Sequence, residues 1–322
     1  MINFNDAPQV VRDFLNYMET IKGKSQNTIK EYFYDLRTFL RFLKIQKGCI
    51  DNNIPFDEIS IDDVTIDLIK EIDLSDLYEY MAYVNRKRSN NANSRARKVA
   101  SIKSFFNYLN TKAKLIDVNP AKDLDSPKLK KGIPKYLSLD ESKQLLHSVE
   151  GKHQARDYAI LTLFLNCGLR LSELVSINLN NIKGDTLTVI GKGNKERTIY
   201  LNQACMNAID NYRRVRPVNG VKDKNALFLS ERKQRISNKT VQFIVKKYIK
   251  KAGLDSEKFS THKLRHTAAT LMYKHGSVDI RTLQEILGHE HLSTTEIYTH
   301  VDNQQLRNAT ERNPLANVNK ED

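Results

Sequence analysis

A stretch rich in proline and lysine, residues 117–138, separates two long segments of helical pattern and constrains the fold more than any other feature. It contains Pro120, Pro127, Pro134 and five lysines. Prolines at this density end regular structure, and the lysines favour an extended basic tether. The sequence therefore predicts two domains that meet near Leu129. The stretch is either a hinge between two lobes or an ordinary loop, and the pattern alone does not separate these interpretations.

The segment before this stretch, residues 1–116, is predicted to form a compact helical domain. Apolar residues recur there at the three- and four-residue spacing of a helix that buries one face. The predicted helices are residues 7–21, 28–45, 65–71, 74–86 and 93–111. Helices of this kind joined by short loops enclose one apolar core, as in other small all-α domains.

The segment after the stretch, residues 139–302, is predicted to be helical apart from one change of period. Around the turn-forming sequence GKGNKE, two short apolar runs within residues 186–201 indicate a β-hairpin. The predicted helices are residues 139–149, 155–166, 171–174, 205–214, 238–251, 262–275, 279–287 and 294–300. The predicted fold class is thus mainly α, with a small β-hairpin or sheet in the C-terminal domain, followed by a tail, residues 303–322.

Charge is distributed unevenly along the first domain. The chain has a formal net charge of +14, yet residues 51–79 are acidic, with no role that we can assign, and the sign reverses at Arg86. The basic block that follows is interleaved with apolar residues. This predicts a helix with one face in the core and another on phosphates, with an ordinary surface helix as the alternative. The candidate DNA contacts are Arg86, Lys87, Arg88, Arg95, Arg97, Lys98 and Lys103.

Several function classes are excluded by what the sequence lacks. Its longest apolar run is shorter than the ~20 residues that a membrane span needs, and its N-terminus has no signal-peptide pattern. Cys49, Cys167 and Cys205 are not in metal-ligand spacing, and no GxxxxGK[ST] phosphate loop occurs. We therefore expect a soluble cytoplasmic protein that uses neither a metal nor another cofactor.

Two motifs at the start of the second domain carry cationic side chains. GLRLSEL places Arg170 at a helix start, with Glu173 three residues later on the same helix face. GKGNKERTIYL places Lys192 where a strand enters a turn and Lys195 within the turn. A surface ion pair and a solvent-exposed hairpin tip are the ordinary interpretations of these two motifs taken singly. The hairpin could equally insert a lysine into a DNA groove, so Lys195 is a further candidate DNA contact.

Two further motifs lie near the end of the domain. In THKLRHT, His262 and Arg265 share one face near a helix N-terminus, which favours anions, and an arginine can hold two phosphate oxygens at once. LGHEHLSTTEIYTHV contains His289 and, nine residues later, Tyr298. A lone histidine or tyrosine is usually a packing residue. Together, however, the four motifs provide cations for the charge of a phosphoryl-transfer transition state and a phenol as nucleophile.

In their order and spacing, the four motifs resemble the catalytic domain of the tyrosine recombinases, the phage integrase family, and are most similar to its Xer type. The helical first domain resembles the SAM-like core-DNA-binding domain of that family. The resemblance implies that the two domains form a C-shaped DNA clamp. It also implies that the enzyme cleaves and rejoins DNA without ATP or metal through a 3′-phosphotyrosyl intermediate and a Holliday junction.

The resemblance further implies a role for each motif residue. The scissile phosphate would be held by Arg170, Arg265 and His289, and Glu173 would orient Arg170. Protons would be moved by His262 and by Lys192, with Lys195 as the rival of Lys192. The nucleophile would be Tyr298. The implied partners are double-stranded DNA with a specific recombination site and other subunits. These would form a homotetramer on two duplexes, or a heterotetramer with a paralogue.

Several alternatives stay open at this point. A type IB topoisomerase-like enzyme would share the chemistry without exchanging partners, and a DNA-binding regulator would share only the scaffold. Residues 303–322 would dock into a neighbouring subunit, as the resemblance implies, or form a disordered polar end. The sequence does not separate chromosome or plasmid dimer resolution from integration and excision of a mobile element.

Overall fold

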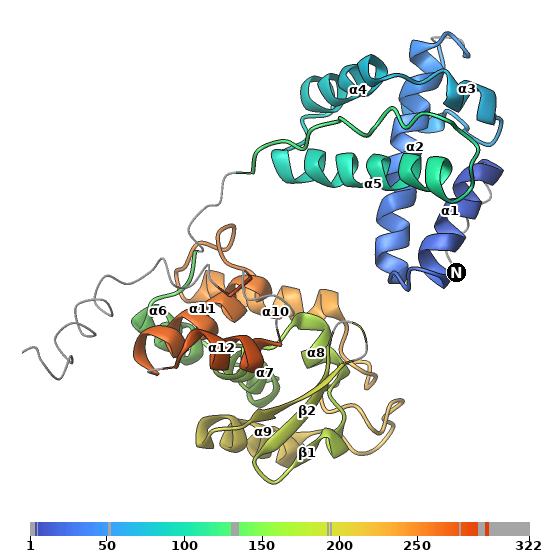
Figure 1. Cartoon of the computed structure of the whole chain (residues 1–322). Coiled ribbons are helices and arrows are strands. Elements are labelled where there is room, and N and C mark those ends of the chain that lie inside the picture. Colours follow the sequence, from blue (N-terminus) through green and yellow to red (C-terminus); the bar gives the residue numbers. More distant parts are fainter. Residues whose placement is uncertain are drawn as a thin grey trace, which may run out of the picture. The chain divides into compact units, whose positions relative to one another are not determined.

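The computed structural model describes residues 4, 6–50, 53–129, 135–191, 193, 195–276, 278–288 and 294–295. The chain divides into two compact units, Met1–Lys131 and Gly132–Asp322 (Figure 1). This division falls inside the stretch 117–138. Among the described helices, none combines the length and the apolar composition that a membrane span requires.

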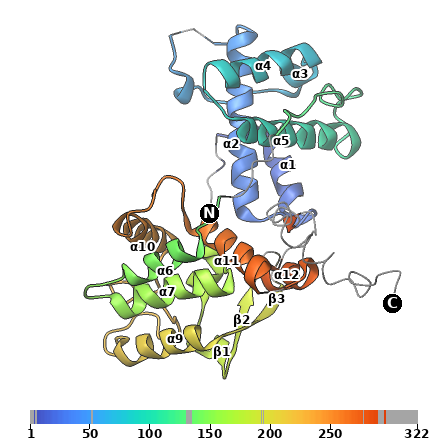
Figure 2. The same cartoon turned by 90° about the vertical axis from the view of Figure 1, so that its left-hand side faces the viewer.

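The first unit is a bundle of helices around an apolar core. Its central helix packs against three others, and the last long helix crosses it (Figures 1 and 2). The core is rich in phenylalanine, and Phe14, Phe39 and Phe105 are fully buried. The elements are α1 (Gln9–Thr20), the central α2 (Gln26–Gln46), a 3₁₀ helix (Phe56–Glu58), α3 (Ile66–Lys70), α4 (Leu74–Arg86) and the crossing α5 (Ala92–Thr111).

A buried ion pair joins α2 to α5. Asp35 is 1% exposed, and one of its oxygens accepts a hydrogen bond from the Lys98 ammonium at 2.8 Å. Its other oxygen accepts from the Ser101 hydroxyl at 2.9 Å and lies 2.8 Å from the Arg97 guanidinium. A carboxylate in an apolar core needs such partners because it has lost its water. Lys98 therefore lies inside the bundle, although its place in a basic block predicted a surface residue.

The first part of the stretch 117–138 packs on the first unit. Ala121 and Leu124 are buried in its core, and the Lys103 ammonium donates to the Leu124 carbonyl at 2.9 Å. The Asn110 side chain donates to the Asp117 carbonyl at 2.9 Å. The helix α5 has already ended at Thr111, and two apolar side chains between Pro120 and Pro127 still reach the core. This part of the chain is therefore less extended than the proline and lysine content predicts.

The second unit contains seven described α-helices, one of which is buried among the others. That helix, α7, lies between α9 and α11, and most of its residues are buried (Figure 1). Burial of most of its surface explains why its sequence is an apolar run without a clear polar face. The helices are α6 (Leu139–His147), α7 (Gln154–Cys167), α8 (Leu171–Ser176), α9 (Gln203–Val215), α10 (Asn238–Lys251), α11 (Thr261–His275) and α12 (Ile280–Leu287).

A small antiparallel sheet lies beside these helices. It consists of β1 (Ile182–Lys183), β2 (Thr186–Ile190) and β3 (Glu196–Tyr200), in that order. The predicted hairpin is β2–β3, with Val189 paired to Arg197. The two-residue β1 was not predicted, because so short a strand has no alternation to detect. The predicted fold class, mainly α with a small sheet in the second domain, is confirmed.

Candidate active site

A buried carboxylate organises the site. Glu173, in the first turn of α8, is 1% exposed. Its side chain accepts a hydrogen bond from the Arg170 backbone N–H at 2.7 Å and from the Arg170 guanidinium at 2.8 Å. The local sequence explains this geometry, because a residue three positions into a helix can reach back to the residue that precedes the helix. The structure thus brings Arg170 and Glu173 together.

Arg265, on α11, contacts the end of α7, the end of α12 and Glu173. It is 4% exposed and donates to the Gly168 carbonyl at 2.6 Å and the Leu287 carbonyl at 2.5 Å. Its guanidinium is 3.8 Å from Glu173. Gly168 ends α7 with φ +59°, and a Cβ atom there would lie 2.9 Å from the Leu287 side chain. Only glycine suits both the backbone angle and the close approach.

A third arginine, Arg197 on β3, completes the cluster. Its guanidinium donates to both oxygens of Glu173, at 2.9 Å for the Nη2–Oε2 pair, and its Nε donates to the Ile286 carbonyl at 3.2 Å. None of the four sequence motifs assigned it a role. A signal that could have found it is its register on the hairpin, since Arg197 is two residues from the buried Ile199 and so shares its inward face.

These contacts determine the charge state of Glu173. Burial alone would raise the pKa of the carboxyl, but hydrogen bonds from Arg197 and from the Arg170 backbone, with the positive charge of Arg197, outweigh burial and lower the pKa below its usual value. Glu173 is therefore ionised. Three guanidiniums around one carboxylate still leave an excess of positive charge, which suits the site to an anion such as a phosphate.

The C-terminal end of α12 is held by the same three arginines. The carbonyls of Ile286, Leu287 and Gly288 accept hydrogen bonds from Arg197, Arg265 and Arg170, the last at 2.8 Å. The last carbonyls of a helix have no partner within it and carry its negative dipole end, so cations stabilise them. Figure 2 shows this end of α12 beside the sheet. The chain therefore leaves α12 toward His289 from a point fixed by the arginine cluster.

His262 lies in the first turn of α11, one turn before His266. The two Nε2 atoms are 3.0 Å apart, and the rings meet edge to face. Loss of water around the ring lowers the pKa of His262, and the positive charges of Lys263, Arg265 and Arg170 lower it further. The imidazole is therefore neutral at pH 7 in the protein without DNA, so it is able to accept a proton or to orient a phosphate by donating one N–H.

Three of the predicted site residues, Lys192, His289 and Tyr298, lie outside the described residues. So do the tail 303–322 and, apart from Thr294 and Thr295, the predicted helix 294–300. Among the neighbouring described residues, Lys195 is exposed, and its carbonyl accepts from the Gly191 N–H at 2.8 Å, which closes the hairpin turn.

Comparisons with known proteins decide the family. The model of the phage integrase family matches residues 135–305, which include all four motifs. This chain belongs to the phage integrase family. It is a site-specific DNA recombinase of the tyrosine type, and the resemblance seen in the motifs is confirmed.

Relatives extend the match over both units of this tyrosine recombinase. The chain is 62% identical over 309 residues to tyrosine recombinase XerC of Caldanaerobacter subterraneus subsp. tengcongensis, a match that covers 96% of this chain and 88% of the relative. It is 33% identical to tyrosine recombinase XerD of Listeria monocytogenes, with 92% and 96% covered. The solved structure of the XerH site-specific recombinase bound to palindromic difH substrate has the same fold, with TM-score 0.69, 22% identity and 94% of each chain covered.

The candidate DNA contacts of this tyrosine recombinase differ in exposure. Arg86, Lys87 and Arg88, at the end of α4, are exposed. Arg95 and Arg97 are partly buried, as is Lys103, whose ammonium is bound to a carbonyl. Lys98 is buried in its ion pair with Asp35. Arg86 and Lys87 thus present their charge to solvent, whereas the Arg88 guanidinium packs over the Phe56 ring and lies 3.6 Å from Asp57. Lys195, the further candidate on the hairpin, is also exposed.

The state of His262 leads to a prediction that needs no DNA. We expect its ring resonances in the folded recombinase to titrate with a midpoint below the ordinary histidine value of about 6.5. Since the folded state takes up this proton less readily than the unfolded state, protonation lowers the free energy of unfolding as pH falls below that value. Side-chain NMR, assigned with His262→Gln, measures the midpoint, and the unfolded protein in urea is the control. A folded-state midpoint at or above the urea value would contradict the prediction.

Proposed function

We propose that this recombinase cuts one DNA strand with the Tyr298 hydroxyl and rejoins it to a new partner. The proposal is supported by one observation above all, the convergence of Arg170 and Arg265 on Glu173 at the end of α12. Such a cluster holds the non-bridging oxygens of a phosphate, where negative charge grows during transfer.

The proposed reaction exchanges one phosphoester for another. The Tyr298 oxygen attacks the phosphorus and loses its proton, and the bond to the 5′ oxygen breaks. Lys192, or its rival Lys195, gives the leaving oxygen a proton, while His262 assists as acid or base and His289 completes the phosphate pocket. The 3′-phosphotyrosyl bond keeps the free energy of the phosphodiester, so a 5′ hydroxyl from a second duplex rejoins the strand without ATP.

The proposed assembly follows from exchange between two duplexes. Four subunits, identical or supplied in part by a paralogue, bind two copies of a specific site and pass through a Holliday junction. Within each subunit, residues 1–116 and 139–302 bind DNA as a C-shaped clamp joined by residues 117–138, and residues 303–322 dock into a neighbour. The substrate is chromosomal, plasmid or mobile-element DNA in the cytoplasm, with dimer resolution or integration and excision as the outcome.

Peptide mapping of the covalent adduct tests the proposed function. The purified recombinase is incubated with a nicked duplex that carries the site recovered by in vitro selection with the same protein. The nick lets the cleaved fragment leave, so the adduct accumulates. We expect a DNA-linked peptide that contains Tyr298. An adduct on another residue would overturn the proposed nucleophile, and relaxation of plasmids without exchange between duplexes would favour a topoisomerase-like activity.

The exposed cations at the end of α4 lead to a prediction about affinity. Replacing Arg86, Lys87 and Arg88 together by serine should weaken binding and flatten its salt dependence. The slope of log K against log salt concentration should become shallower by about 0.9 for each phosphate that the variant no longer neutralises. Fluorescence anisotropy with labelled duplex at several salt concentrations measures this slope.

A variant matched in charge is the control for this measurement. Serine in place of Lys183, Arg214 and Lys224, all exposed on the second unit and outside the candidate set, removes the same three charges. If both triple variants change the slope equally, general charge explains binding and α4 is not a specific contact surface.

A further inference from the structure

Arg197 is the residue in the site to which neither the motifs nor the proposed reaction gave a role. Its side chain is 13% exposed and faces inward from β3. Its guanidinium donates to acceptors that belong to the site, namely the two oxygens of Glu173 and the Ile286 carbonyl. An arginine uses its planar fork to fix two acceptors at a defined angle, which a lysine does not do.

The Arg197 guanidinium also packs against the glycines that precede two proposed catalytic residues. A Cβ atom on Gly288, just before His289, would lie 3.0 Å from Arg197 Cδ and 3.1 Å from its Nη1. A Cβ atom on Gly191, just before Lys192, would lie 3.6 Å from Glu173 Oε1 and 3.7 Å from Arg197 Nη1. Arg197 thus lies between the hairpin turn, α8 and the end of α12.

Arg197 also determines how firmly Glu173 holds the phosphate-binding arginines. With Arg197 present, both oxygens of Glu173 are engaged by its fork. The backbone N–H and the guanidinium of Arg170 each donate one further bond, and the Arg265 guanidinium stays at 3.8 Å. Without Arg197, the buried carboxylate would have only Arg170 and Arg265 to neutralise it. It would then draw both guanidiniums toward itself and compete with the phosphate for them.

We propose that Arg197 is a positioning residue for strand cleavage. Through Glu173 and the end of α12 it fixes the positions of the Arg170 and Arg265 guanidiniums. Through the same contacts it fixes where the chain begins the segments that lead to Lys192 and His289. This inference rests on the proposed function. The hydrogen bonds of Arg197 are all to other groups of the protein, and Arg197 itself is not proposed to contact DNA. Loss of Arg197 should therefore lower the rate of cleavage and leave DNA affinity unchanged.

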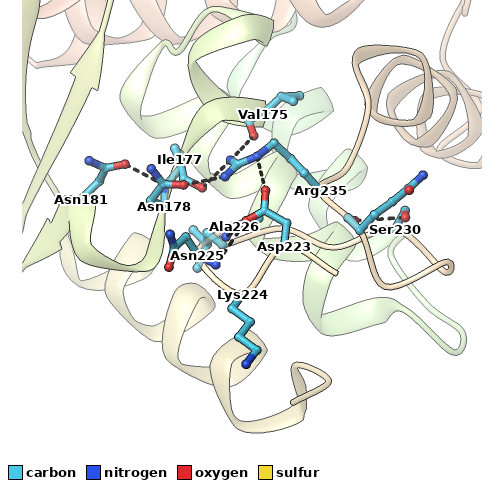
Figure 3. Close-up of polar contacts among 12 residues, drawn as sticks. Val175, Ile177, Asn178, Asn181, Asp223, Lys224, Asn225, Ala226, Ser230 and Arg235 are labelled. Atoms are coloured by element: carbon cyan, nitrogen blue, oxygen red, sulfur yellow. Dashed lines mark hydrogen bonds and ion pairs between the residues drawn. The ribbon is translucent and has the colours of Figure 1, made fainter. Parts of the chain in front are cut away.

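Arg235 provides a matched control in the same unit. Like Arg197, it is a partly buried arginine that binds one carboxylate and at least one carbonyl. It donates to Asp223 at 2.9 Å, to the Val175 carbonyl at 3.0 Å and to the Asn178 side chain at 2.6 Å (Figure 3). These partners are distinct from those of Arg197. Arg235→Ala therefore removes a similar set of bonds without removing a contact to Glu173 or α12, and its nearest link to the site is the Val175 carbonyl, two residues after Glu173 on α8.

The test compares Arg197→Ala, Arg197→Lys and Arg235→Ala in single-turnover cleavage of the nicked duplex at saturating enzyme. We expect Arg197→Ala to slow cleavage on the order of 10²-fold, as for misplaced catalytic groups, with unchanged DNA affinity. Arg197→Lys restores the charge but not the fork, so it should recover only part of the rate. Added guanidinium ion should raise the rate of Arg197→Ala. Arg235→Ala should lose comparable thermal stability yet cleave at the wild-type rate.

In the cleavage assay, two outcomes would overturn the role of Arg197: wild-type cleavage by Arg197→Ala, or an equal loss of cleavage in Arg235→Ala. A second readout is independent of the chemistry. In ¹⁵N-arginine spectra, Arg197→Ala should change the side-chain signals of Arg170 and Arg265, and Arg235→Ala should leave them unchanged; if Arg197→Ala leaves them unchanged, the inference fails. A wild-type protein that forms no adduct would refute the proposed function instead, and the spectra would still decide the role of Arg197.

Discussion

Tyr298→Phe is expected to abolish the covalent protein–DNA adduct and to leave DNA binding nearly unchanged. The substitution removes a single oxygen atom, the proposed nucleophile, and keeps the aromatic ring. No other group of the protein forms a bond to phosphorus in the proposed mechanism, so the loss should be complete at the detection limit and not a partial decrease. Adducts that survive sodium dodecyl sulfate are counted on the nicked duplex, and affinity is measured on the same duplex by anisotropy.

Tyr200→Phe is a matched control for this experiment. Tyr200 is on β3 and is 78% exposed, so it tests whether removal of any accessible phenol affects the assay. We expect this variant to form the adduct at the wild-type level. An SDS-stable adduct that persists in Tyr298→Phe would refute the assignment of the nucleophile.

The second large effect is expected from the two arginines of the phosphate clamp. Arg170→Ala and Arg265→Ala should each slow cleavage on the order of 10²–10³-fold or more, since each removes fixed positive charge where the transition state gathers negative charge. Their effects on stability should differ. Arg265 is buried and satisfies the Gly168 and Leu287 carbonyls, so its removal leaves buried acceptors unpaired and lowers the melting temperature.

Arg170→Ala is therefore the cleaner of the two tests. The Arg170 side chain is 30% exposed, so in Arg170→Ala water can replace some of the hydrogen bonds that the guanidinium donates. Single-turnover cleavage, DNA affinity and melting temperature are measured for both variants, with Arg214→Ala on the exposed end of α9 as control. Cleavage at the wild-type rate by Arg170→Ala or Arg265→Ala would refute the clamp role of that arginine.

Elements governed by local patterns were predictable from the sequence. The bounds of α4 and α10 agree with the predicted ranges because each begins at a capping side chain, Asp73 or Ser237, and follows a clear apolar period. The Arg170–Glu173 pair was predictable for the same reason, since its members are one helical turn apart. The hairpin was indicated by its glycine-rich turn, and its edge strand β1 was too short to detect.

Features that depend on distant partners were not predictable in this way. Lys98 lies in a basic block, but its partner Asp35 is on another helix, so the sequence indicated a surface charge where the structure has a buried ion pair. Arg197 is separated from Glu173 by 24 positions and from Ile286 by 89. A one-dimensional pattern gives the inward register of such a residue, but not the carboxylate and the helix end that surround it.

The central claim, that the arginine cluster holds the phosphate attacked by Tyr298, is tested most directly by a crystal structure of the recombinase trapped on its nicked duplex. We predict a bond between the Tyr298 oxygen and phosphorus, with the Arg170 and Arg265 guanidiniums on the non-bridging oxygens and His262 within hydrogen-bond distance. A phosphate bound to another side chain, or one that neither arginine contacts, would contradict the claim.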